Sequence, residues 1–158
     1  MNVQMKKELF DSLSVDATGH ACFEPMVSVY QEGIRRRRNS NEAYEYRIEF
    51  YKSLSQGQQA LLGFFTYYDH AIRSNVEFQG ISKNYLSQQI FGIVKKGAEY
   101  FNDNDMCQLL LRIEQSILAD IQNDELYRQF CEIAPRTLAK IGACIKENPT
   151  EFICFSLH

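Results

Sequence analysis

Residues 55–72, SQGQQALLGFFTYYDHAI, are the stretch that decides the fold class. Ser55 and Gln58 have the spacing of a capping box, in which two side chains satisfy the first free backbone N–H groups of a helix. The apolar residues that follow recur at the three- and four-residue spacing of an α-helix: Leu61, Phe64, Phe65, Tyr68 and Ile72. The stretch therefore predicts an apolar helix that begins directly after Ser55.

The same helical period continues toward the N-terminus. We expect one helix over Val3–Leu13 and a second that starts near Phe23–Pro25, where a proline suits the first turn, and runs into Arg35–Arg38. Asn39 and Glu42 are spaced as another cap. They open a third helix with an apolar stripe formed by Tyr44, Ile48 and Tyr51.

Toward the C-terminus, Ser74–Gly80 is expected to be a loop, and the next helix carries the apolar residues from Leu86 to Phe101. The polar cluster Asn102–Asp105 is typical of a turn and helix cap, which predicts a helix over Met106–Ile121.

A break at Asn123–Asp124 separates this helix from a further one around Leu126–Ile133. Pro135 then suits the first turn of a last helix, which ends at Asn148 because the following Pro149 disfavours helical backbone before it. Glu151–Leu157 is a short apolar tail, expected to dock as a strand or in extended form. The pattern predicts an all-α single-domain bundle of about seven or eight helices over residues 1–158, with a short extended C-terminal tail.

Composition narrows the class of protein. The chain has 158 residues, 45% of them hydrophobic, and its 17 basic and 20 acidic residues give a net charge of −3, which excludes a uniformly basic nucleic-acid binder. The amino end lacks the apolar core of a secretory signal, and no apolar run reaches the roughly 20 residues of a membrane span. The five cysteines are odd in number and lack C-x-x-C spacing. We therefore expect a cytoplasmic protein with reduced thiols and no membrane segment.

The small net charge hides two regions of opposite sign. Arg35, Arg36, Arg37 and Arg38 form a basic block. Between residues 99 and 132, only Arg112 and Arg128 oppose eight acidic residues: Glu99, Asp103, Asp105, Glu114, Asp120, Asp124, Glu125 and Glu132. Such an acidic surface can attract a basic partner, although caps and ordinary solvent-facing positions would give the same composition. The arginine block suits phosphate groups or an acidic partner, or is a solvated helix end.

No metal site or cofactor is predicted. Asp103, Asp105 and Glu114 have the first, third and twelfth spacing of a calcium loop, but Cys107 and Gln108 occupy the positions that need an oxygen ligand and a glycine. The zinc spacings C-x-x-C and H-E-x-x-H are absent, as are the glycine-rich phosphate loops.

An alternative site centres on His70, which follows Tyr68 and Asp69. His70 is a candidate general base that Glu77 or Asp69 would orient, in a pocket lined by tyrosines. Adjacent helix residues do not face each other, so Asp69 and His70 make a poor pair, and a histidine hydrogen-bonded in a helix–helix groove is the simpler interpretation. An aromatic cluster could line this pocket or could form ordinary core: Phe64, Phe65, Tyr67, Tyr68, Phe78 and Tyr85. Tyr67 is the exception, because it is expected to point away from the apolar stripe into an interface.

Three short motifs carry a family resemblance: Leu54-Ser55-Gln56-Gly57-Gln58, Glu77-Phe78 and Lys96-Gly97-Ala98. Over about residues 50–120 the chain resembles the DNA-mimic-protein (DMP)-like family of small helical bacterial domains, mostly of unknown function. Where that family usually has an Asn-Asn-Gly-Gly-Phe turn, this chain has Ser74–Gly80 without paired glycines, so its turn must differ. The resemblance implies an all-helical fold and, as for named members, binding of a DNA-binding protein through an acidic face.

Two functional hypotheses follow. The first is a non-enzymatic protein-interaction module that binds a basic or DNA-binding protein through the acidic region, and direct nucleic-acid binding is disfavoured. The alternative is a small enzyme or ligand binder around His70, Glu77 and neighbouring tyrosines. A second copy of the chain, or a neighbouring segment, would cover the apolar tail Phe152–Leu157, which leaves a homodimer open. The candidate binding residues are Tyr67, His70, Glu77, Phe78, Asp103, Asp105, Asp120, Asp124 and Glu125, with Arg35, Arg36, Arg37 and Arg38 as a basic patch.

Overall fold

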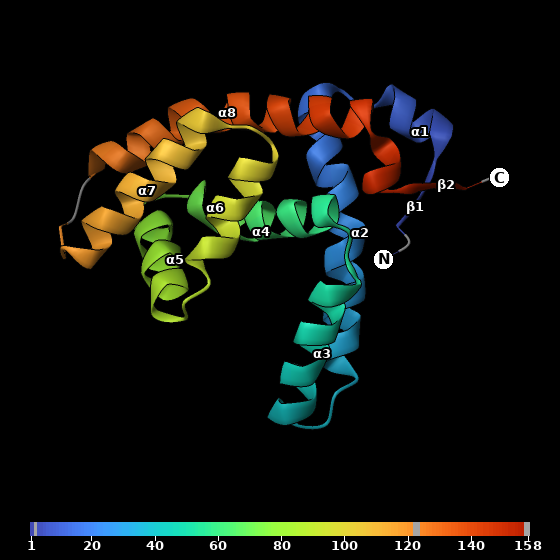
Figure 1. The fold of residues 1–158 in the computed structure, drawn as a ribbon, viewed down its shortest axis with the longest axis horizontal. Helices are drawn as coiled ribbons and strands as arrows, with labels where there is room; N and C mark the ends of the chain where they lie inside the picture. Colours follow the sequence, from blue (N-terminus) through green and yellow to red (C-terminus); the bar gives the residue numbers. More distant parts are fainter. Residues whose placement is uncertain (2, 122–123, 157–158) are drawn as a thin grey trace.

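The computed structural model describes residues 1, 3–121 and 124–156. This part of the chain contains eight α-helices, one 3₁₀ turn and a two-stranded parallel sheet (Figure 1). The expected all-α single-domain bundle is thus confirmed. In chain order the elements are β1 (Gln4–Lys6), α1 (Lys7–Ser12), α2 (Val15–Arg35), α3 (Ser40–Ser53), α4 (Gln56–Ala71), α5 (Asn75–Ser87), α6 (Phe91–Tyr100), α7 (Asn104–Leu118), α8 (Asp124–Glu147), η1 (Pro149–Glu151) and β2 (Cys154–Ser156).

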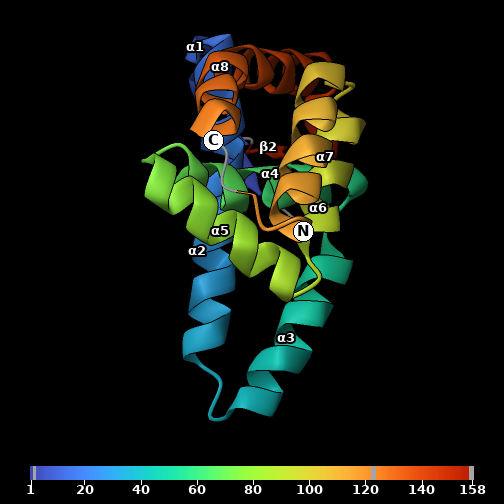
Figure 2. The same cartoon turned by 90° about the vertical axis from the view of Figure 1, so that its left-hand side faces the viewer.

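Helix α4, the stretch on which the sequence analysis opened, is the centre of the fold. It packs against α2, α5 and α6, while α8 crosses the top of the molecule and contacts α2 and α7 (Figures 1 and 2). The apolar stripe of α4 faces this interior, and Leu61, Phe64 and Phe65 are fully buried. Other helices and the segment after η1 add the remaining large buried side chains, among them Met26, Phe78, Phe91, Leu109, Leu110, Phe130 and Phe152.

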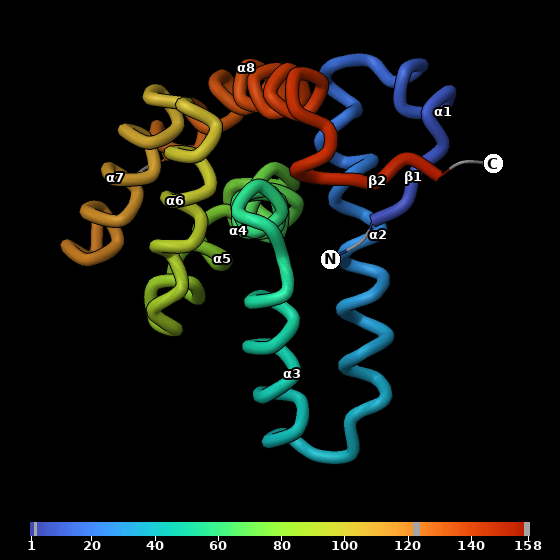
Figure 3. Tube along the Cα trace, turned by 45° about the vertical axis from the view of Figure 1, so that its right-hand side comes forward, coloured from blue at the N-terminus to red at the C-terminus, as the bar shows by residue number. Residues whose placement is uncertain are grey.

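The C-terminal half of α2 and all of α3 project from this body as a hairpin, which we call the arm (residues 27–53; Figures 1 and 3). Its two helices are held together by aromatic rings. Tyr46 stacks on Tyr30 at a centroid distance of 6.2 Å, and Phe50 lies 5.3 Å from the same Tyr30 ring. Gly33 makes this packing possible, because a Cβ atom there would stand 2.0 Å from the Tyr46 ring.

The helix caps expected from the sequence are confirmed. The Ser55 hydroxyl accepts from the Gln58 N–H at 3.1 Å, and the Gln58 side chain accepts from the Ser55 N–H at 3.2 Å, which completes the capping box of α4. The Asn39 side chain accepts from the Glu42 N–H at 2.9 Å at the start of α3, and Asp103 caps α7. These polar pairs fix where three of the helices begin.

Both prolines expected at helix starts lie instead inside long helices, which is a correction. Helix α2 begins at Val15, with Ser14 as its cap, and passes through Pro25. Helix α8 passes through Pro135, so the two segments expected around it are one helix. A proline inside a helix removes one backbone hydrogen bond and costs roughly 3 kcal/mol, which burial of the apolar residues on either side offsets.

The expected loop over Ser74–Gly80 is also wrong. Ser74 accepts from the Glu77 N–H at 3.1 Å and caps α5, which starts at the next residue. The helix expected through Leu86–Phe101 is divided at Gln89, whose φ of 59° is left-handed. The Ile90 N–H then reaches back to the Tyr85 carbonyl at 2.9 Å, a helix-ending motif that ordinarily uses glycine and that the sequence therefore did not signal.

The segment Val3–Leu13 is not one helix, because its first part is strand β1. This strand pairs in parallel with β2, with Gln4 opposite Cys154, and the Cys154 N–H donates to the Val3 carbonyl at 2.7 Å. The extended C-terminal tail is thereby confirmed for residues 154–156. Leu157 of that tail and Asn123 of the expected helix break lie outside the described residues.

Candidate functional site

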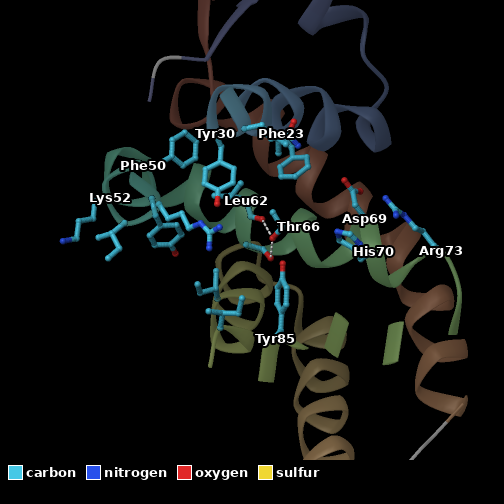
Figure 4. Close-up of a pocket in the computed structure, with 18 residues that line it drawn as sticks. Phe23, Tyr30, Phe50, Lys52, Leu62, Thr66, Asp69, His70, Arg73 and Tyr85 are labelled. Carbon is cyan, nitrogen blue, oxygen red and sulfur yellow. Dashed lines mark hydrogen bonds between the residues drawn. The ribbon is translucent and has the colours of Figure 1, made fainter. Parts of the chain in front are cut away.

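A cleft of about 750 Å³ opens between the arm and the body of the fold (Figure 4). One face of α4 forms its floor, because Leu62, Thr66 and Asp69 are spaced three and four residues apart on the same side of the helix, and Arg73 continues the row just past the helix end at Ala71. At 1.5 Å rise per residue, this row of side chains is roughly 16 Å long. The cleft is therefore an elongated groove.

Apolar side chains form the walls of the groove. The arm contributes Tyr30, Ile48 and Tyr51, and the opposite wall contains Tyr85 from α5 and Ile93 from α6. The apolar surface continues along α3 beyond the cleft, because Tyr44 lies one helical turn before Ile48 and is 64% exposed. An occupant of the groove would thus meet mainly hydrocarbon and aromatic surface.

The carboxylate of Asp69 is engaged at one end of the groove. Its Oδ1 lies 2.7 Å from Nε2 of His20 on α2, and the His20 ring packs on Phe65 at a centroid distance of 4.6 Å. Burial raises the pKa of Asp69, and the charges of His20 and Arg73 act in the opposite direction. Asp69 therefore serves to hold α2 against α4.

Tyrosine hydroxyls supply further polar groups. Burial raises the pKa of Tyr85 and of Tyr51, so both phenols keep their protons at neutral pH. Thr66 lies between the two walls and donates its hydroxyl to the Leu62 carbonyl at 2.8 Å. The Thr66 proton is therefore already used, and the tyrosine phenols are the O–H groups that this part of the groove can offer to a bound group.

Three cations stand along the groove. Lys52 lies at one end and Arg73 at the other, as Figure 4 shows, and Arg47 on α3 also lines the cleft. Of the lining residues that the structure describes, Asp69 is the one carboxylate. The electrostatic character of the groove is therefore cationic.

The structure brings together only part of the predicted His70 site. His70 lines the groove, beside Asp69 and Arg73 (Figure 4). Glu77 is exposed on the first turn of α5 and is not among the described residues that line the cleft beside His70. The tyrosines that line the groove come from α2, α3 and α5.

Tyr67 and Phe78 belong to the core, which corrects their assignment to a binding surface. Tyr67 is fully buried, its ring meets Phe91 and Phe130 edge to face, and its hydroxyl bonds to Ser82 at 2.7 Å. Residues of α5, α6 and α8 cover it within the chain, so the expected interface position is wrong. Phe78 is 1% exposed and packs on Phe130.

Tyr67→Phe should change how stability depends on alkaline pH. Burial raises the pKa of Tyr67, and the Ser82 hydrogen bond only partly opposes this shift. Above about pH 10 the unfolded chain loses this proton while the folded chain keeps it, so the free energy of unfolding falls as pH rises.

The variant should lose about 1 kcal/mol at pH 7, through the missing hydrogen bond, and should show a shallower decline at alkaline pH. Urea unfolding at a series of pH values measures both effects. Part of the decline should remain, since burial also raises the pKa of Cys22 to about 12. An unchanged slope would mean that Tyr67 ionises equally in both states.

Asp103 is a buried structural residue and not part of an acidic surface. Its carboxylate accepts from the Met106 N–H at 3.3 Å, from the Thr137 hydroxyl at 2.5 Å and from the Lys140 ammonium at 3.1 Å. Through these bonds it joins the start of α7 to the middle of α8. This correction removes one carboxylate from the predicted acidic region.

Three of the other acidic residues are paired with cations. Asp105 lies 3.7 Å from Arg136, and Glu125 bonds to Arg128 at 2.5 Å. The remaining contacts are structural: Glu114 pairs with Lys95 at 2.5 Å, Asp124 accepts from Asn75 at 2.7 Å, and Asp120 is the left-handed residue (φ 52°) that ends α7. Cations from this region and from its neighbours therefore neutralise part of the acidic surface expected between residues 99 and 132.

The arginine block lies at the far end of the arm, around the turn between α2 and α3. Arg35 is the last residue of α2, and Arg36 pairs with Glu32 one turn earlier. The guanidinium of Arg37 lies over the Tyr46 ring at 4.4 Å. Two of the four side chains thus have intramolecular partners, and Arg38 is exposed.

Sequence reasoning missed most of the groove. The sequence does indicate one wall, because Ile48 and Tyr51 belong to the apolar stripe expected on α3. Whether that stripe is exposed depends on how the arm projects from the body, which the sequence does not show. No local signal marks His20, whose partner is 49 residues away. Within the described residues, no group of three or more His, Cys, Asp and Glu side chains gathers as a metal site would require.

Comparison with protein-family models, with curated proteins and with solved structures gives no match for this chain. No helix in the described part of the chain has both the length and the apolar character needed to cross a bilayer.

Proposed function

We propose that this chain is a non-enzymatic protein-interaction module whose groove receives the apolar face of a helix from a partner protein. The proposal keeps the functional class expected from the sequence but moves the contact from the acidic region to the groove between the arm and α4. The observation that carries it is the continuous apolar strip that leaves the cleft along α3.

The dimensions of the groove support a helical occupant. The floor, from Leu62 on α4 to Arg73 just past its end, is roughly as long as eleven residues of helix, or three turns. Helix-in-groove recognition uses anchors at the i, i+3, i+4 and i+7 positions of one face, which need a groove of about this length.

The exposed part of the arm supports an occupant longer than the cavity itself. Tyr44 and Ile48 are 64% and 38% exposed, although both belong to the apolar stripe of α3. A ligand confined to the cleft would leave Tyr44 in water, whereas a helix of three turns or more can cover both side chains.

Ile48→Asn should weaken binding of groove-directed helices about tenfold. The probe is a displayed library of amphipathic peptides of about 18 residues, with Leu, Ile, Phe and Met varied on one face and selected on the full chain. Losing one buried aliphatic contact costs about 1.4 kcal/mol, which corresponds to that factor in the dissociation constant. Binding of selected peptides to both chains is measured by fluorescence anisotropy.

Leu111→Asn is the matched control. Leu111 is 40% exposed in the middle of α7, away from the groove. Replacing it with Asn should therefore change helix propensity and exposed apolar surface about as much as Ile48→Asn does. It should leave peptide affinity unchanged, and circular dichroism checks that both variants are folded. Failure to select any peptide, or equal loss of affinity in the two variants, would contradict the proposal.

A small amphiphilic molecule is the second candidate occupant, because about 750 Å³ lies within the range of small-molecule pockets. In that case a ligand of the size of the cleft should bind whether or not Tyr44 is present. Tyr44→Asn separates the two candidates, since only an occupant extending along α3 should lose affinity.

A further inference from the structure

We infer that the helix received by the groove is acidic, with carboxylates flanking its apolar face near both ends. This inference rests on the proposed function and names the chemistry of the partner. It is carried by the distribution of charge along the groove.

The first charged position is on the arm. Arg47 and Lys52 are exposed on α3 and line the cleft. Neither takes part in any ion pair found among the described residues. Their charges are therefore available to a carboxylate on the occupant.

The second charged position is at the C-terminal end of α4. Arg73 is exposed there beside His70, and the nearby carboxylate of Asp69 already contacts His20 at 2.7 Å. Figure 4 shows Lys52 and Arg73 at opposite ends of the groove, with Leu62 and Thr66 between them. The order along the groove is thus cation, apolar centre, cation.

This order excludes a basic occupant and favours an acidic one. A Lys-rich or Arg-rich helix would bring its positive charges against three cations of the groove. The carboxylate of Asp69 already contacts His20 and would not offset this repulsion. An acidic helix would place opposite charges at both ends of its apolar face. Exposed pairs of this kind contribute mainly to selectivity and to the rate of association, and salt weakens them.

The test is the composition of helices selected on the wild-type chain. The library keeps one apolar face and varies the flanking positions among Glu, Gln and Lys. We expect Glu to exceed Lys at least tenfold at flanking positions about ten residues apart. We also expect affinity to fall severalfold between about 0.05 and 0.5 M salt.

Charge-reversal variants of the chain provide the second part of the test. Lys52→Glu and Arg73→Glu should each weaken a Glu-flanked peptide about fivefold and leave its Gln-flanked counterpart unchanged. Lys83→Glu makes the same change on an exposed face of α5, outside the described lining of the cleft, and should affect neither peptide.

The possible outcomes separate the inference from the proposed function. Equal selection of Glu, Gln and Lys flanks, with binding that still depends on Ile48, would overturn the acidic partner and leave helix binding intact. Selection of no peptide that depends on Ile48 would overturn both. Sedimentation showing a dimer that Ile48→Asn dissociates would mean that a second copy of this chain fills the groove, which also overturns the inference.

Discussion

Gly142→Ala should lower the free energy of unfolding by about 3 kcal/mol. A Cβ atom at Gly142 would stand 1.8 Å from the carbonyl oxygen of Val15 and 2.7 Å from its carbonyl carbon. Both atoms belong to the backbone of α2, so no side chain can rotate to make room. The two helices would have to separate where α8 crosses α2, and neighbouring core contacts would be lost with them.

Gly80→Ala is the control for this substitution. Gly80 is an exposed residue of α5, and a Cβ atom there would meet no atom of the described residues within 4 Å. Alanine should therefore stabilise the protein by about 0.5–1 kcal/mol through helix propensity alone. Urea unfolding of the three proteins gives the comparison. If Gly142→Ala unfolds at the same urea concentration as the wild-type chain, α2 and α8 do not approach each other this closely.

Asp103→Ala should also destabilise the fold by about 3 kcal/mol. The substitution removes the cap of α7 and leaves the buried Thr137 hydroxyl without its carboxylate partner. It also removes the contact with Lys140 that joins α7 to α8. Loss of a helix cap and of a buried polar network adds up to an effect of this size.

Asp105→Ala is a close control, because it removes a carboxylate two residues away on the same helix. The Asp105 side chain is 59% exposed, against 2% for Asp103, and its one ion pair spans 3.7 Å. An exposed pair of this kind contributes at most about 1 kcal/mol. Similar losses in the two variants, measured by urea unfolding, would show that burial does not distinguish these carboxylates.

Asp103 also illustrates what the sequence could predict. The polar cluster at residues 102–105 correctly indicated a turn and a helix cap, because capping depends on residues close together in the chain. The same local logic identified the caps at Ser55 and Asn39. It could not show that Asp103 is buried against Thr137, since that contact joins residues 34 positions apart.

The errors in the fold have a common cause. Pro25 and Pro135 are usual signals for the first turn of a helix, and Ser74–Gly80 is rich in turn-forming residues, yet both prolines lie inside helices and the segment belongs to α5 and its cap. Long-range packing offsets these local preferences, and a single sequence does not show its strength. Gln89 shows the converse, because a helix ends there without the glycine that would have marked it.

The groove could be predicted even less well than the fold. His70 was identified as a possible pocket residue, but its expected neighbours Glu77, Tyr67 and Phe78 are exposed elsewhere or buried. The sequence predicts that Ile48 and Tyr51 form an apolar stripe. It does not indicate that this stripe lines a cleft. A groove formed by separate helices depends on tertiary arrangement, which periodicity within one helix does not contain.

The pairing of β1 with β2 has a consequence for the order of folding. It joins Gln4 to Cys154, so it closes a loop of 150 residues for a few hydrogen bonds and the burial of Val3, Met5 and Ile153 against the helices. The entropy cost of closing a loop rises with its length, which means that this contact gains little until the helices have brought the two segments together. The small sheet is therefore expected to form last, after the helical body, and to open first when the protein fluctuates toward the unfolded state.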